Sequence, residues 1–128
     1  MVAAHYHVDA KYLSGLKMPE VTMTEFCVVS VTWPETVDVA AIAGKLVAER
    51  LCACASISKG HRSFYTWKGD LEASDEILMT IKTRADLLEN LEERIRELHP
   101  YEVFEFLAVP VIYGNKAYLD WITESVCR

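Results

Sequence analysis

A long β-hairpin is predicted in the middle of the chain, and it restricts the folds that the rest can adopt. Residues 53–67 form a strand-like stretch that ends in the alternating aromatic segment SFYTW. Residues 68–70 are a turn signal, and residues 75–83 alternate again as the returning strand. Lys59-Gly60 interrupts the first strand and is typical of a bulge or bend. One face of the returning strand would present Ile77, Met79 and Ile81.

Two amphipathic helices are predicted, one before and one after this hairpin. The first has apolar residues at helical spacing, namely Val39, Ile42, Ala43, Leu46, Val47 and Leu51. Thr32 with Glu35 matches a capping box before it, and Pro34 suits a first helical turn. The apolar stripe of the second helix is Leu88, Leu91, Ile95 and Leu98. Thr83 is its predicted cap, and His99-Pro100 ends it because the residue before proline avoids the α region.

The order of elements predicts the fold class. Residues 26–31 are a short apolar strand, residues 104–112 are another, and residues 117–126 form a short last helix. The order βαββαβ plus a terminal helix is that of a ferredoxin-like α+β sandwich with a four-stranded antiparallel sheet. Both long helices would cover one face of the sheet. Phe64, Tyr65 and Trp67 would lie on or near the other, which predicts association with another chain.

Length, charge and cysteine usage exclude several classes of protein. The 128 residues suggest one folded domain over residues 25–128, preceded by an irregular extension over residues 1–24 that contains His5 and His7. The net charge of −6 disfavours a nucleic acid partner. No apolar run is long enough to cross a membrane. Four cysteines without a CxxC pair, and no apparent signal peptide, predict a reduced cytoplasmic protein.

Five short segments resemble motifs of the CutA family, in the family's order and spacing. They are ERLCAC at 49–54, SFYTWKG at 63–69, EILMTIKT at 76–83, HPYE at 99–102 and GNKAYLDW at 114–121. The resemblance covers about residues 26–124 without a gap. It implies a homotrimer similar in plan to PII signalling proteins and a role in divalent-cation tolerance. It also implies, from animal members, a link to the anchoring of acetylcholinesterase. No reaction is established for the family.

The resemblance further implies metal binding, with copper as the family's best-known ligand. Some bacterial members are assigned a copper site from a cysteine late in the first strand and two adjacent histidines. This sequence has Val31 and Leu98-His99 there, so only His99 of that set is present. The candidate metal ligands are therefore His99, Cys54 and Glu105, for copper or another divalent cation at a cleft between subunits. No cofactor is required.

The family motifs also carry a polar and aromatic set that, by resemblance, lines the same cleft. Its members are Tyr65, Trp67, Glu76, Lys82 and Tyr101. They can hold a small ligand or a metal, or they can instead lock the subunits together. A histidine in such a cleft would titrate near neutral pH.

Three non-enzymatic functions and one enzymatic function remain open at this point. The first is divalent metal tolerance, and its rivals are a PII-like small-molecule sensor and a scaffold for another protein. Cys54 with His99 can form a thiolate–imidazole pair, although a buried thiol and a capping histidine explain the same residues. An enzyme using Cys54 or Lys82 is the remaining rival, but no phosphate loop, zinc motif or nucleophile elbow occurs. The prediction is a protein without catalytic activity.

Overall fold

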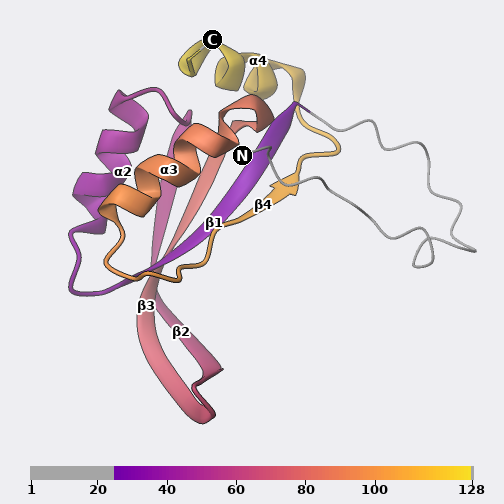
Figure 1. Ribbon diagram of the computed structural model, residues 1–128. Coiled ribbons are helices and arrows are strands. Elements are labelled where there is room, and N and C mark those ends of the chain that lie inside the picture. The colour runs from indigo at the N-terminus through magenta and orange to yellow at the C-terminus, as the bar shows by residue number, and fades with distance from the viewer. Residues whose placement is uncertain (1–24, 128) are drawn as a thin grey trace, which may run out of the picture.

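The computed structural model describes residues 25–127, which form one four-stranded antiparallel sheet with helices (Figure 1). In chain order the elements are β1 (Phe26–Pro34), α2 (Val39–Ala48), β2 (Cys54–Trp67), β3 (Asp70–Arg84), η1 (Ala85–Leu87), α3 (Leu88–Leu98), β4 (Leu107–Pro110) and α4 (Lys116–Ser125). The strand order is β2-β3-β1-β4, so β2 and β4 are the edges. The predicted α+β class and ferredoxin-like order are confirmed. The predicted extension over residues 1–24, with His5 and His7, lies outside the described residues.

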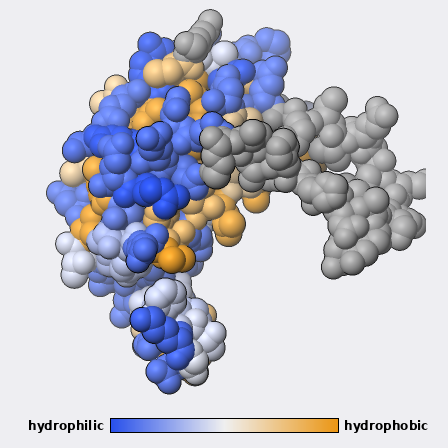
Figure 2. Space-filling view, in the orientation of Figure 1, coloured by the Kyte–Doolittle hydropathy of each residue, from blue (hydrophilic) through white to orange (hydrophobic). Residues whose placement is uncertain are grey.

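The core lies between the sheet and the helices α2 and α3, which cover the same face (Figure 1). Alternation along β1 sends Val29, Val31 and Trp33 fully into this layer. The expected core face of β3 is confirmed, because Ile77, Met79 and Ile81 are all buried. The helices contribute Leu46, Leu91 and Ile95. In the view of Figure 2 hydrophilic residues predominate over α3, as expected for an amphipathic helix.

The two predicted threonine caps are wrong. β1 continues through Pro34 and pairs with β3 along its whole length, so Thr32 lies in a strand. Asp38 caps α2 instead, and its carboxylate accepts a hydrogen bond of 3.1 Å from the backbone N–H of Ala41. Thr83 also lies within a strand, fully buried, and its hydroxyl donates to the carbonyl of Leu51 at 2.7 Å. Both threonines that the local sequence predicted as helix caps are therefore paired residues within strands.

The helix α2 is shorter than its apolar stripe predicted. It ends at Ala48, and Arg50 adopts a left-handed backbone with φ of 60°. The guanidinium of Arg50 donates to the carbonyls of Glu124, Ser125 and Val126 at 3.1–3.2 Å. It thereby satisfies backbone acceptors at the end of α4, where no helical donor follows. Of the predicted stripe, Val47 is 41% exposed.

The last strand is also shorter than predicted, since only four of the residues in 104–112 pair with β1. Phe104 and Phe106 precede it and pack against the core from a loop. The predicted last helix is confirmed, with its start one residue earlier and Asn115 as its cap. Residues 99–106 are thus free of regular structure, and they face the hairpin.

The hairpin β2–β3 is confirmed together with its bulge and turn. The register between β2 and β3 shifts between Ser58 and His61, where Gly60 has a φ of 79°. At the tip, Lys68 and Gly69 have φ of 50° and 86°, which suits a two-residue turn with both central residues left-handed. The hairpin projects beyond the helical layer (Figure 1).

A glycine-to-alanine pair tests the turn. Gly69→Ala places a Cβ on a residue with φ of 86° and should destabilise the fold by roughly 1 kcal/mol. Gly44→Ala should stabilise it by up to about 1 kcal/mol, because Gly44 lies exposed within α2 and a Cβ there meets no atom within 4 Å. Thermal denaturation at one protein concentration measures both. Equal shifts in the same direction would contradict the assigned turn.

Candidate functional site

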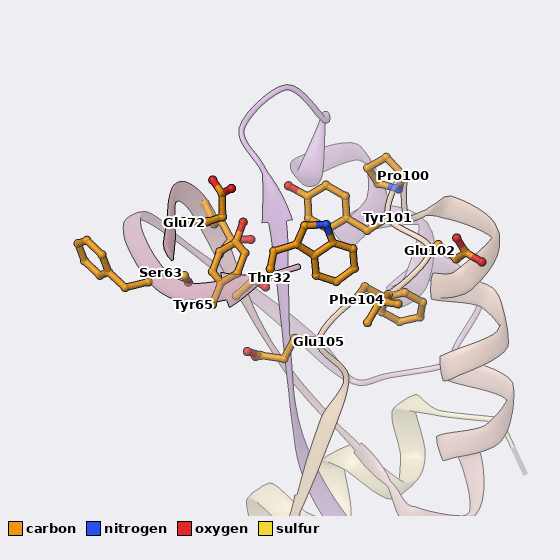
Figure 3. A pocket seen from close by; sticks show the side chains of 13 residues that line it. Thr32, Ser63, Tyr65, Glu72, Pro100, Tyr101, Glu102, Phe104 and Glu105 are labelled. Atoms are coloured by element: carbon orange, nitrogen blue, oxygen red, sulfur yellow. The ribbon is translucent and has the colours of Figure 1, made fainter. Parts of the chain in front are cut away.

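A pocket of about 800 Å³ lies between the outer half of the hairpin and the loop after α3 (Figure 3). β2 contributes Phe64, Tyr65 and Trp67, and the loop contributes Tyr101 and Phe104. In Figure 3, Tyr65 lies across the pocket from Tyr101 and Phe104. The walls are therefore aromatic and come from two separate parts of the chain.

The polar part of the pocket is acidic. Four glutamates line it, Glu72 and Glu76 from β3 and Glu102 and Glu105 from the loop. Within the described part of the chain no lysine, arginine or histidine lines it. The hydroxyl of Ser30 donates to the Glu105 carboxylate at 2.6 Å. The charge of the lining favours a cationic ligand over an anion.

Glu76 differs from the other carboxylates in its burial. It is only 6% exposed. Among the described residues its carboxylate has no hydrogen-bond donor and no ion-pair partner. Alternation along β3 puts it on the same face of the sheet as Thr32, which also lines the pocket. Its oxygens are not among the fully enclosed polar atoms without a partner, which in the described chain are Trp33 Nε1 and Ser74 Oγ, so the carboxylate opens into the pocket. With so little exposed surface it keeps only part of its hydration, and a ligand in the pocket can reach it.

His99 lies behind the pocket and holds its loop in place. Nδ1 accepts a hydrogen bond of 3.1 Å from the backbone N–H of Tyr101, so Nε2 carries the proton and donates to the carbonyl of Thr32 at 2.8 Å. The imidazole stacks on Trp33 and on Phe104, with ring centroids 4.4 and 4.9 Å away. Burial lowers the pKa of His99 below its ordinary value, against smaller opposing effects of the Thr32 hydrogen bond and the Glu76 charge.

The structure brings together most, but not all, of the residues predicted for the site. Tyr65, Trp67, Glu76, Tyr101 and Glu105 all line the pocket.

Cys54 and Lys82 do not line the pocket. Cys54 pairs with Lys82 across β2 and β3, whereas Thr32 at the pocket pairs with Leu78 of β3. Lys82 and Leu78 are four residues apart on the same strand, a separation of roughly 13 Å. The described chain therefore does not place the thiol of Cys54 beside the imidazole of His99. The sulfur of Cys54 lies 3.6 Å from the hydroxyl of Ser56 instead. No group of three metal-binding side chains gathers within residues 25–127 of one chain.

Sequence reasoning missed Thr32, Glu72 and Glu102 as site residues. Glu72 is the cross-strand partner of Tyr65, so its place followed once the hairpin register was known. Glu102 follows Tyr101 within the HPYE segment, so the same motif that indicated Tyr101 could have indicated Glu102. Thr32 was assigned to a cap, which hid its place at the end of β1.

Comparison with known proteins identifies the family. The model of the CutA1 divalent ion tolerance protein family matches residues 27–125. The chain belongs to this family. The divalent-cation tolerance protein CutA of Thermus thermophilus is 42% identical over 98 residues, which are 77% of this chain and 95% of that protein. Mouse Protein CutA is 44% identical over 99 residues, 75% of this chain and 56% of that protein. The chain thus spans little more than half of the mouse relative.

Solved structures support the same assignment for the fold. The cation tolerance protein of Thermus thermophilus superposes with a TM-score of 0.77 and 40% identity, covering 80% of this chain and 99% of that one. CutA1 from Oryza sativa has a TM-score of 0.78 and 37% identity, and the match covers 82% of this chain and 96% of the rice chain. CutA relatives occur in different compartments, since one from Arabidopsis thaliana is chloroplastic and one from Archaeoglobus fulgidus is described as periplasmic. Over residues 25–127 this CutA chain has no helix with the length and apolar character to span a membrane.

The buried His99 predicts a pH-dependent stability. Because its pKa is lower in the folded state than in the unfolded chain, the unfolded chain binds the proton more readily as the pH falls below about 6.5. The stabilisation by neutral His99 is complete above that pH and is lost as the pH falls through the folded-state pKa. His99→Gln should flatten this part of the melting-temperature profile. Identical profiles for wild type and His99→Gln would assign the acid sensitivity to other groups.

Proposed function

We propose that this CutA protein acts without catalysis in divalent-cation tolerance, as a cytoplasmic homotrimer that binds a cation such as copper weakly at a cleft between copies. The observation that carries the proposal is the acidic pocket, which residues 25–127 line with four carboxylates and no cationic side chain. Membership of the divalent ion tolerance family supports it. The four free cysteines are in keeping with a reducing compartment.

Exposed apolar residues support self-association. Leu107 and Val109 on the edge strand β4 are 62% and 57% exposed, and Ile112 and Tyr113 beyond it are more exposed still. Phe64 and Leu71 are similarly exposed on the hairpin. Exposed apolar side chains in such number mark a surface that another chain can cover. A closed symmetric assembly would cover these surfaces. The family resemblance implies that the assembly contains three copies.

The geometry within one chain supports weak rather than tight metal binding. Both nitrogens of His99 are engaged inside the chain, and Cys54 lies away from the pocket. Glu105 is the remaining metal-ligand candidate, and it is exposed at the pocket. Copper favours nitrogen and sulfur ligands in sets of several, so one carboxylate is a poor site. We therefore propose that a second copy of the chain completes the ligand set.

The pocket also favours a second function, a PII-like module that senses a small molecule. Its volume of about 800 Å³ is within the range of sites that hold ligands of drug size. A scaffold role for a partner protein is the third candidate, and it rests on the same exposed apolar surface.

Native mass spectrometry of the reduced protein, with and without Cu(II), tests the metal proposal. The background should be Cys127→Ser with His5→Ala and His7→Ala, because an exposed thiol and an HxH pair can bind copper independently. We expect a trimer with up to one copper per chain, and Glu105→Gln should lower the occupancy at a fixed copper concentration by several-fold. Glu89→Gln, an exposed change outside the pocket, is the matched control.

The outcomes separate the parts of the proposal. A trimer without specific copper would favour the sensor or the scaffold, and a monomer would remove the trimeric architecture. Unchanged copper occupancy in Glu105→Gln would place any cation site elsewhere.

A further inference from the structure

We propose that the pocket binds an organic ammonium or guanidinium group, with the positive charge at Glu76 and the carbon chain against the aromatic walls. This rests on the pocket assigned in the proposed function, and it gives that pocket an organic cation as its ligand in place of a metal ion. The charge can come from a free amine or from a lysine or arginine of a second copy of the chain. Both sources share the chemistry that the pocket offers.

The first step is the buried charge of Glu76. Several other carboxylates of the described residues have cationic neighbours: Glu49 accepts from Arg94 at 2.8 Å, and Asp120 accepts from Lys116 at 2.7 Å. Those carboxylates are at or near the surface, where pairing contributes little. Glu76 is more than nine-tenths buried, lines the pocket and has no such partner. A group at this position that supplied N–H donors and positive charge would replace the hydration that burial removes.

The second step is the aromatic wall. Tyr65, Trp67, Tyr101 and Phe104 all line the pocket, and the faces of such rings attract cations. Two of these rings already attract cations of the chain: Arg96 lies 5.1 Å from the Phe104 centroid and Lys68 lies 6.0 Å from that of Trp67. Neither cation lines the pocket, so the described residues give its interior aromatic and acidic groups without a positive charge.

The third step separates an organic cation from a metal ion within one chain. A metal needs several ligands around one point, and no three histidine, cysteine or acidic side chains of residues 25–127 meet that condition. The pocket is far larger than one ion, and its carboxylates are spread over β3 and the loop. An extended amine can place nitrogens near more than one carboxylate while its methylene groups cover aromatic surface. The dispersed charge therefore fits an alkylammonium better than a point charge.

Isothermal titration calorimetry with spermidine at physiological ionic strength tests the free-amine source. Glu76→Gln keeps the shape of the side chain and removes its charge, so it should weaken binding at least tenfold. The exposed Glu89→Gln makes the same change of charge outside the pocket and should leave binding unaltered. Tyr101→Leu should weaken binding several-fold, whereas Tyr101→Phe keeps the ring face and should not. Magnesium chloride at equal charge should not displace the amine.

A second measurement keeps the two sources apart. If the charge comes from a second copy, spermidine will not bind to the wild type, and Glu76→Gln will weaken self-association in native mass spectrometry while Glu89→Gln will not. Equal spermidine affinity in Glu76→Gln, or no effect of Glu76→Gln on either binding or assembly, would overturn the proposal. The copper result with Glu105→Gln is independent of these readouts, so failure of the metal proposal and failure of this one are distinguishable.

Discussion

The antiparallel pairing of β1 with β3 is the constraint on which the rest of the molecule depends. It runs over nine residues and joins the two central strands of the sheet. Because side chains alternate along paired strands, this one register sends Trp33 and Ile77 into the core and Thr32 and Glu76 to the opposite face. A shift of one residue would exchange the two sets, so the core and the pocket are specified together. The helices then cover the face that alternation made apolar.

His99 connects the end of α3 to this pairing and to the pocket loop. A neutral imidazole has one donor and one acceptor, and here the donor is used on Thr32 in β1 and the acceptor on Tyr101 in the loop. The same ring is stacked between Trp33 and Phe104. A histidine used in this way has no lone pair left for a metal, because coordination needs an unprotonated nitrogen directed away from other donors. The HPYE segment therefore has a structural explanation that is independent of any bound ion.

Sequence periodicity was sufficient for the kinds of element and their order, because each helix and strand has a clear apolar period. It failed where a local signal competed with long-range pairing. Thr32 and Thr83 have the residues of caps around them, yet both lie in strands whose partners are distant in sequence. For the pocket, the family motifs supplied Tyr65, Glu76 and Tyr101 but also Cys54 and Lys82, which lie elsewhere on the sheet. Which residues of one motif share a site depends on the register between strands, and a single sequence does not contain that register directly.

Glu76 departs from the rules that hold in most of the core, since the described chain gives its nearly buried carboxylate no hydrogen-bond donor. The core around Val31 and Met79 buries apolar groups, and the Thr83 hydroxyl in the same sheet has its acceptor, as expected for a sequence selected to fold uniquely. The indole N–H of Trp33 and the hydroxyl of Ser74 are buried without a partner among the described residues. A carboxylate with so little exposed surface, and no donor among residues 25–127, loses part of its hydration, and Gln there would remove the charge while keeping the shape. Such departures from the rules of folding concentrate at sites where a ligand supplies the missing interaction. The same glutamate faces a pocket whose other walls also favour positive charge, so burial, charge and aromatic composition all indicate a cation as the missing partner.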